Sequence, residues 1–313
     1  MSQCILCGSD KYKILSFGKH QYEGKTFSLV ECLDCHLRYR SPMPDKTTIQ
    51  KAYDFEYFQS EYKGGIEKSY IDNRDIYLRE AKQLIKIIRI YKRYGKLLEI
   101  GCAGGYVIKE VQKAGYDVFG VELSQEMADY ANKELGLKVI KGDFQEVDFD
   151  KNKFDIIYSA HTLEHVPDPL QFLSKAKNIL NKDGILILEL PINFNYALIS
   201  VLLGIFKIVK NILRGRFRIK KQMFWYTSQT EKIDKRFPYH LYEFTPRIIK
   251  KLLSRAGFRI ILFKTFDAYP KQARYSTFKS KILKFINLIT HKISYRIRFF
   301  NWGDRVLVVC RLL

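Results

Sequence analysis

The sequence predicts an α/β protein with a doubly wound, mostly parallel sheet and helices on both faces, preceded by a small metal-binding module. Short apolar runs alternate with amphipathic stretches between residues 96 and 190, and a glycine-rich turn follows the first run, which is typical of βαβ units. Two Cys-x-x-Cys pairs lie near the start of the chain. A length of 313 residues suits one catalytic domain plus a small module.

The N-terminal cysteines predict a structural zinc ribbon over residues 1–45. Residues 8–31 separate the two pairs, and each Cys-x-x-Cys turn can deliver two of the four thiolates of a tetrahedral zinc ion. The N-terminus has no apolar signal-peptide core, so metal binding is favoured over disulfides and a cytoplasmic protein is expected. A redox pair is the alternative. The expected zinc ligands are Cys4, Cys7, Cys32 and Cys35.

Residues 46–95 are expected to form a linker and an N-terminal helical lid. Pro42 and Pro44 break regular structure just before it. The aromatic residues 53–58 suit packing between the two parts of the chain, with a lid over a cofactor as the alternative. Residues 71–94 then show apolar recurrence at helical spacing and end near Gly95.

The next segment has the pattern of a nucleotide-binding βαβ unit. A strand over Lys96–Gly101 runs into the turn Gly101–Gly105, and a helix follows over Tyr106–Ala114. The glycines allow a sharp turn, and the free N–H groups of a helix N-terminus suit a ligand. A second strand ends at Glu122, about 20 residues past the first glycine, where an acid can accept both ribose hydroxyls.

The pattern continues to the end of the chain. Asp143 follows a third strand and suits a bond to an adenine amino group. The expected later elements are a strand over Phe154–Ser159, a helix through Leu180, a turn over Asn181–Gly184, a strand over Ile185–Leu190, a closing helix over Thr245–Ala256, and closing strands over Phe258–Phe266 and Arg305–Arg311.

Together, Glu99-Ile-Gly101-Cys-Ala-Gly-Gly105, Glu122, Gly142-Asp143 and Leu163-Glu164-His165-Val166 resemble class I S-adenosylmethionine-dependent methyltransferases. The resemblance covers about residues 96–311. It implies a Rossmann-like seven-stranded sheet with a reversed seventh strand over a domain of residues 96–313, and S-adenosylmethionine as cofactor. With the zinc module, the chain looks more specifically like methyltransferases of sugar and cell-surface glycan pathways. The dinucleotide fingerprint G-x-G-x-x-G is absent, which argues against NAD.

The resemblance also implies roles for the cofactor residues. Glu99 would face the methionine amine, Gly101–Gly105 would line the methionyl end, Glu122 would hold the ribose and Asp143 the adenine. Ala103 departs from the family, which often has glycine there. The expected cofactor-binding residues are Glu99, Gly101, Cys102, Ala103, Gly104, Gly105, Glu122, Leu123, Gly142, Asp143, Phe144 and Ser159.

His161, Glu164 and His165 are candidates for the acceptor side. They have i, i+3, i+4 spacing, so a helix would place all three on one face, at the sheet edge where doubly wound folds bind ligands. A histidine could act as general base. Resemblance to quinone-pathway O-methyltransferases, where E-x-x-E-H binds a metal, raises a divalent-metal site instead, with His161 replacing the first glutamate. A merely structural role is the third interpretation.

His240 is a further catalytic candidate. It precedes Thr245-Pro246, a favourable helix start. Related enzymes carry a similar segment beside the acceptor pocket, so His240 either contacts substrate or bonds the backbone of a crowded loop.

The net charge of +21 and two apolar, basic insertions indicate where in the cell the protein acts. Residues 190–206 carry no charge and a basic run follows them, while residues 269–300 contain no acid. Such segments suit an anionic membrane interface, with a dimer contact or a lid as the alternative. The insertions are expected at about residues 193–236 and 269–302.

The sequence thus predicts a methyltransferase acting on a sugar, glycan precursor or lipid-linked acceptor, a peripheral protein at the cytoplasmic membrane face. An RNA methyltransferase is the first alternative, because basic charge attracts phosphates, although the basic residues lie in apolar stretches. A non-catalytic membrane-associated adaptor is the second. The oligomeric state is left open.

Overall fold

The computed structural model describes residues 3–53, 74–192, 233–266 and 305–313. Most of the two predicted insertions, and residues 54–73 of the predicted lid, lie outside the described residues. Among the helices of the described ranges, none has a stretch long and apolar enough to cross a membrane.

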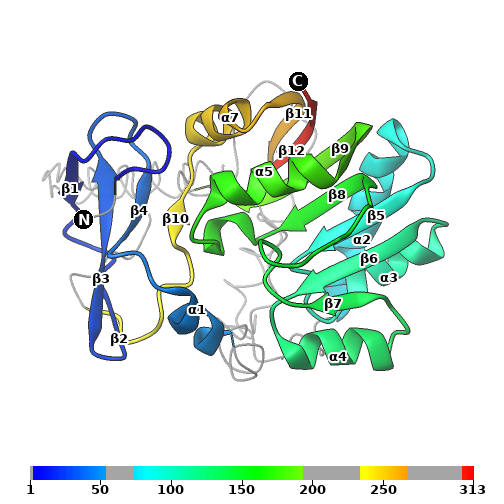
Figure 1. Cartoon of the computed structure of the whole chain (residues 1–313), viewed down its shortest axis with the longest axis horizontal. Helices are drawn as coiled ribbons and strands as arrows, with labels where there is room; N and C mark the ends of the chain where they lie inside the picture. The colour runs from blue at the N-terminus through cyan, green and yellow to red at the C-terminus, as the bar shows by residue number, and fades with distance from the viewer. Residues whose placement is uncertain (1–2, 54–73, 193–232, 267–304) are drawn as a thin grey trace, which may run out of the picture.

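The N-terminal module is a small antiparallel sheet (Figure 1). Its central strand β3 (Lys25–Cys32) pairs with the other three: β1 (Tyr12–Ile14), β2 (His20–Tyr22) and β4 (Arg38–Ser41). The helix α1 (Lys46–Ala52) follows. It begins at Asp45, whose carboxylate accepts a hydrogen bond from the backbone N–H of Thr48, a favourable N-cap. Part of the predicted linker is therefore helical.

The larger sheet has seven strands in the order β11-β12-β9-β8-β5-β6-β7. Only β12 runs in the opposite direction, since it is antiparallel to both of its neighbours and the other pairs are parallel. The predicted seven-stranded sheet with its reversed strand is confirmed. The strands are β5 (Lys96–Ile100), β6 (Asp117–Glu122), β7 (Val139–Lys141), β8 (Phe154–Ala160), β9 (Leu180–Pro191), β11 (Phe258–Phe266) and β12 (Arg305–Leu312).

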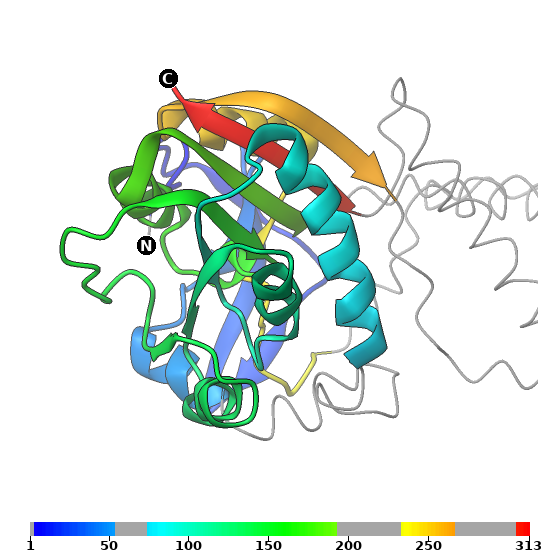
Figure 2. The ribbon, with the colours of Figure 1, turned by 90° about the vertical axis from the view of Figure 1, so that its right-hand side faces the viewer.

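Helices cover both faces of this sheet, as Figures 1 and 2 show. The helices of the first face are α2 (Arg74–Tyr91), α3 (Tyr106–Lys113) and α4 (Gln125–Lys133); those of the second are α5 (Pro169–Ile179) and α7 (Pro246–Arg255). Adjacent residues of one strand point to opposite faces: Leu97 packs in the cluster that contains α2, α3 and α4, and Leu98 in the cluster that contains α5 and α7. The doubly wound fold class is confirmed.

Two local predictions differ from the structure. The strand β9 begins at Leu180 rather than Ile185, because the chain leaves α5 already extended and residues 181–184 form a bulge between the pairs Phe154–Leu180 and Ile156–Ile185. The segment after β8 is a single 3₁₀ turn, η3 (Leu163–His165), and His161 lies outside it with φ 52°. The helix considered for His161–His165 is therefore wrong.

A short strand joins the N-terminal module to the rest of the chain. β10 (Tyr242–Glu243) pairs antiparallel with β4, with Tyr242 opposite Tyr39. One hydrophobic cluster includes Cys4 and Tyr39 of the module as well as Leu186 and Ile248. The module therefore shares a core with the face of the large sheet that α5 and α7 cover.

Gly120 in β6 offers a test of this packing. An added Cβ would lie 2.6 Å from Cys102 Sγ and 2.9 Å from Val139 Cγ2, so we expect Gly120→Ala to lower the free energy of unfolding by about 1–3 kcal/mol, measured by urea denaturation. The double variant Gly120→Ala/Cys102→Ala should recover part of the loss, beyond the sum of the single effects. Equal stability of Gly120→Ala and wild type would contradict this account.

Candidate functional site

The predicted cofactor residues gather at one edge of the large sheet. Glu99 is the second-last residue of β5, Glu122 ends β6, and Asp143 follows β7. These three parallel neighbours have their carboxyl ends together, which is where doubly wound sheets bind ligands.

The turn after β5 has a backbone that glycine favours. Gly101 has φ 74°, and a Cβ there would lie 2.4 Å from Thr162 Oγ1, so a side chain cannot be accommodated. Ala103 has φ 46°, a left-handed conformation that costs alanine about 1 kcal/mol. Its N–H donates to Glu122 Oε2 at 2.7 Å. The substitution of the family's glycine is thus a strained one, held by a bond to a buried acid.

Two buried carboxylates face this turn. Burial, followed by the charges of Glu80 and Glu122, raises the pKa of Glu99 well above its usual value, and its Oε2 is buried without a hydrogen-bond partner among the described residues. Burial also raises the pKa of Glu122, against hydrogen bonds from the backbone of Ser124, Ala103 and Leu123. Glu99 is the group that still needs a donor, because an unpaired buried polar atom costs free energy.

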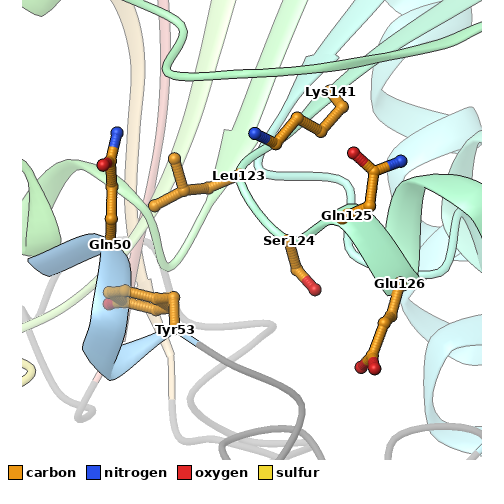
Figure 3. A pocket seen from close by; sticks show the side chains of 7 residues that line it. All are labelled: Gln50, Tyr53, Leu123, Ser124, Gln125, Glu126 and Lys141. Carbon is orange, nitrogen blue, oxygen red and sulfur yellow. The ribbon is translucent and has the colours of Figure 1, made fainter.

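A cavity of about 360 Å³ lies beside the end of β6 (Figure 3). Its walls come from two parts of the chain: α1, which follows the N-terminal module, on one side, and the β6–α4 connection with Lys141 on the other. The lining residues are Gln50, Tyr53, Leu123, Ser124, Gln125, Glu126 and Lys141. The expected cofactor residue Leu123 therefore borders a cavity whose opposite wall is the end of α1.

Other predicted cofactor residues support the loops. Ser159 Oγ donates to the carbonyl oxygen of Ile100 at 3.2 Å, and Asp143 Oδ1 accepts from the backbone N–H of Gln145 at 2.9 Å. The ring of Phe144 is buried against Phe172, with centroids 4.9 Å apart. Remaining members of the predicted set lie in these loops, with Cys102, Gly104 and Gly105 buried and Gly142 partly buried.

After the neighbouring strand β8, the candidate acceptor residues surround one buried carboxylate, that of Glu164. Glu164 Oε1 lies 3.5 Å from His161 Nδ1 and 3.6 Å from His165 Nε2. His161 reaches this position through its left-handed backbone, and its own N–H donates to the carbonyl oxygen of Glu189 at 2.9 Å. His161, Glu164 and His165 therefore lie close together, as predicted, but a turn rather than one face of a helix brings them together.

Glu164 is ionised although its side chain is fully buried. Burial acts to raise its pKa, but His161 and His165 outweigh burial and hold the pKa well below the usual range. Both carboxylate oxygens lack hydrogen-bond partners among the described residues, and the contacts of 3.5 and 3.6 Å are too long for good hydrogen bonds. The two imidazoles therefore approach the carboxylate closely without making short hydrogen bonds to it.

His240 joins this group from the segment before β10. Its ring packs edge-on against His165, with centroids 4.9 Å apart. Desolvation, together with the charge of His165, lowers its pKa to about 4, although its side chain is accessible to solvent. His240 is neutral at pH 7 and a weak base.

Two contacts of the site were not predicted. The Tyr53 hydroxyl lies 2.7 Å from His165 Nδ1, and Glu189 Oε1 lies 3.8 Å from His161 Nε2 and 3.0 Å from Arg305 Nη1. Tyr53 belongs to the aromatic segment singled out in the sequence, and Glu189 to a predicted strand end. Nothing in the sequence indicated that either residue would contact a histidine of this cluster.

The four N-terminal cysteines form a second cluster. Their sulfur atoms all lie within 4.8 Å of one another, with Cys4 and Cys35 at 3.5 Å and Cys7 and Cys32 also at 3.5 Å. Tetrahedral zinc with Zn–S bonds of about 2.3 Å implies sulfur separations of about 3.8 Å. Burial opposes ionisation of Cys32, but N–H groups of Cys35 and Asp34 outweigh it and lower its pKa to about 7.

Comparison with known proteins gives the wider context. Residues 98–188 match the family model described as "Methyltransferase domain". A ubiquinone biosynthesis O-methyltransferase of Actinobacillus pleuropneumoniae serotype 7 is 31% identical over 136 residues, 40% of this chain and 58% of the relative. One of Histophilus somni is 31% identical over 134 residues, 38% of this chain and 55% of the relative. The chain thus spans less than two thirds of these curated relatives.

Among solved structures, a possible histamine N-methyltransferase of Thermotoga maritima is 20% identical, covers 82% of this chain and 97% of its own, and has a TM-score of 0.48. The magnesium protoporphyrin IX methyltransferase of Synechocystis PCC 6803, with bound S-adenosylhomocysteine, is 14% identical, covers 85% and 99%, and also has a TM-score of 0.48. No substrate follows from likenesses at this level. The residues that match the methyltransferase domain model, 98–188, run from β5 to β9 of the seven-stranded sheet.

Proposed function

We propose that the chain is an S-adenosylmethionine-dependent methyltransferase whose small-molecule acceptor places its reacting atom beside His161. The main support for the proposal is that a buried carboxylate without a hydrogen-bond partner among the described residues, Glu99, lies on the strand next to the histidine cluster around Glu164. Glu99 Oε2 is buried without a partner near the end of β5, and the cluster around Glu164 follows β8, the strand paired with β5.

The carboxylates of Glu99, Glu122 and Asp143 suit the polar groups of S-adenosylmethionine. The methionine ammonium of the cofactor would supply the donor that Glu99 lacks, as a charge-assisted hydrogen bond. Glu122 would hold the ribose, and Asp143 the adenine. When bound, the cofactor supplies a methyl group on a sulfonium, the electrophile of the reaction. The protein's own contribution is to align the acceptor and accept its proton.

His161 is the residue we assign as general base. Its Nδ1 faces the ionised Glu164, while its Nε2 is buried without a hydrogen-bond partner among the described residues. A proton taken up by Nε2 would face Glu189, whose carboxylate Oε1 is 3.8 Å away. His240, with its pKa near 4, suits a hydrogen bond with the acceptor better than proton removal.

The acceptor is proposed to be a hydroxyl compound, with a sugar, glycan precursor or lipid-linked molecule at a membrane surface as the class. The curated relatives are named O-methyltransferases, and an imidazole base suits a hydroxyl. The net charge of +21 favours an anionic surface or a phosphorylated acceptor. The apolar, basic insertions that motivate the membrane setting lie outside the described residues.

A divalent metal is the alternative for the acceptor site. Glu164, His165 and His240 offer ligand atoms within 4.8 Å of one another, and two imidazoles with a carboxylate suit several divalent metals. The E-x-x-E-H motif suggested His161, Glu164 and His165 as ligands. In the structure, the grouped ligand atoms belong to Glu164, His165 and His240 instead. Metal content distinguishes the alternatives, as described below.

Cofactor binding tests the first half of the proposal. Glu99→Gln removes the carboxylate and should weaken S-adenosylmethionine binding about ten- to hundredfold in isothermal titration calorimetry, since a hydrogen bond to a charged group contributes about 1.5–3 kcal/mol. Glu110→Gln, an exposed-face change on α3 that loses an ion pair with Lys113, is the matched control. Absence of binding by the wild-type protein would favour the adaptor alternative.

Methyl transfer tests the second half. Labelled S-adenosylmethionine is incubated with membrane, soluble small-molecule and RNA fractions of a cell extract, and the labelled product is identified by mass spectrometry. His161→Asn keeps a residue that tolerates positive φ and should reduce transfer about 10²- to 10⁴-fold with cofactor affinity unchanged.

His36→Asn is the matched control, because His36 also has positive φ, at 65°, and is exposed in the N-terminal module. Full activity of His161→Asn would exclude it as the base. Label in RNA alone would replace the small-molecule proposal by the RNA alternative.

We also propose that the four cysteines bind one structural zinc ion. Elemental analysis should find one zinc per chain, lost in Cys32→Ala together with thermal stability, and retained in Cys310→Ala, which changes a buried cysteine of β12 outside the cluster. A second metal equivalent that persists in Cys32→Ala and disappears in His240→Ala would favour the metal alternative. Wild-type protein without zinc would refute the zinc assignment.

A further inference from the structure

We propose that α1, the helix that follows the N-terminal module, covers the base end of the cofactor site, and that the side-chain amide oxygen of Gln50 on this helix accepts a hydrogen bond from the 6-amino group of the adenine. The inference rests on the proposed binding of S-adenosylmethionine. It adds a cofactor-binding residue from outside residues 96–313, the part of the chain that holds all the expected ones.

The helix α1 lies across the carboxyl ends of the parallel strands. Lys46, its first residue, forms an ion pair with Glu146 after β7. At its C-cap, the Tyr53 hydroxyl is 2.7 Å from Nδ1 of His165, which follows β8. The strands β5 and β6 lie between β8 and β7, so these outer strands are about 14 Å apart.

The length of α1 matches this span. A helix of 7 residues is about 10 Å long, and the long side chains at its two ends close the remaining distance to the loops after β7 and β8. Figure 1 shows α1 at this edge of the sheet. The helix therefore passes over the ends of β5 and β6, where the expected cofactor residues gather.

The cavity of about 360 Å³ lies between α1 and these strand ends. Gln50 and Tyr53 line it from α1, and Leu123 lines it from the end of β6. In Figure 3 the side chain of Leu123 points toward Gln50. Small-molecule sites have volumes of about 300–1,000 Å³, so this cavity is large enough for a flat ring and too small for the whole of an extended cofactor.

The residues around the cavity indicate which part of the cofactor fits there. Leu123 directly follows Glu122, the residue proposed for the ribose, and Lys141 lies two positions before Asp143, the residue proposed for the adenine. A ligand group in the cavity is therefore flanked by the ribose residue and the adenine residue. The base is the part of the cofactor that meets this condition, and Leu123 offers it an apolar contact.

Gln50 has an amide that is available to a ligand. It is exposed, and its side chain forms no hydrogen bond with another described residue. The second amide that lines the cavity, that of Gln125, donates to Asp129 Oδ1 at 2.9 Å. Glu126 also lines the cavity, but in Figure 3 its carboxylate points away from Leu123.

The chemistry of an amide suits the amino edge of adenine. A glutamine side chain has one acceptor oxygen and one donor NH₂, which match the amino group and a ring nitrogen of the base. The 6-amino group has two hydrogens, so Asp143 and Gln50 can each accept one. Lys141 offers only donors and cannot take this role.

Isothermal titration calorimetry with two ligands tests the contact. One ligand is S-adenosylhomocysteine, and the other is its analogue without the 6-amino group of the purine. We expect Gln50→Ala to weaken binding of S-adenosylhomocysteine about three- to tenfold. Binding of the analogue should weaken by no more than about twofold, because it lacks the group that Gln50 contacts. Alanine suits an exposed helical position, so the variant should fold.

Two variants serve as controls. Thr47→Ala changes an exposed residue of α1 that does not line the cavity, and it should leave both affinities unchanged. Gln125→Ala removes the amide that bonds Asp129 and should keep the wild-type preference for the amino group. Equal losses for both ligands in Gln50→Ala, no loss for either, or loss of the preference in Gln125→Ala instead overturns the contact.

Hydrogen–deuterium exchange tests the position of α1 in the wild-type protein. Saturating S-adenosylhomocysteine should slow exchange of the α1 backbone amides, because a ligand in the cavity holds the helix against the sheet. Bound ligand with unchanged exchange in α1 would overturn the inference and leave the proposed function intact. Failure of the wild-type protein to bind S-adenosylhomocysteine or S-adenosylmethionine would instead refute the proposed function, and the inference with it.

Discussion

The cluster of His161, His165 and His240 depends on one constraint: the Glu164 carboxylate between them is fully buried. A buried anion must be compensated, and here the compensation comes from His161 and His165. The backbone of the same residue accepts a hydrogen bond from Leu241 N–H at 2.9 Å, which holds the segment that carries His240. β10 begins directly after Leu241 and pairs with β4 of the N-terminal module. The hydrogen bond to Glu164 therefore also helps to position that module.

The sequence predicted what depends on local pattern. Alternating apolar runs predicted the strands, and Thr245-Pro246 predicted the start of α7, where Thr245 Oγ1 accepts from Ile248 N–H at 3.3 Å. Contacts between distant segments could not be found this way. The pairing of Tyr242 with Tyr39 and the bond between Tyr53 and His165 join residues far apart in the chain, and no periodicity encodes them. The spacing of His161 and Glu164 was informative, but the backbone that brings them together is left-handed rather than helical.

The N-terminal module packs as an integral part of the domain that contains the seven-stranded sheet. Its residues share a hydrophobic cluster with α5 and α7, and α1 supplies one wall of the cavity beside Glu122. A small cysteine-rich module commonly needs a metal because its own core is too small. Here the larger domain adds apolar surface to that core, so the shared core stabilises the module.

The alanine at position 103 has a consequence for how tightly a ligand can be held. A glycine there would sample many backbone states before binding, and ordering it would cost conformational entropy. Ala103, at φ 46°, has far fewer states to lose, and its N–H is already aimed at Glu122. The strain is present before any ligand arrives, so the association itself loses less disorder. The turn exchanges some folding stability for a preorganised ligand surface.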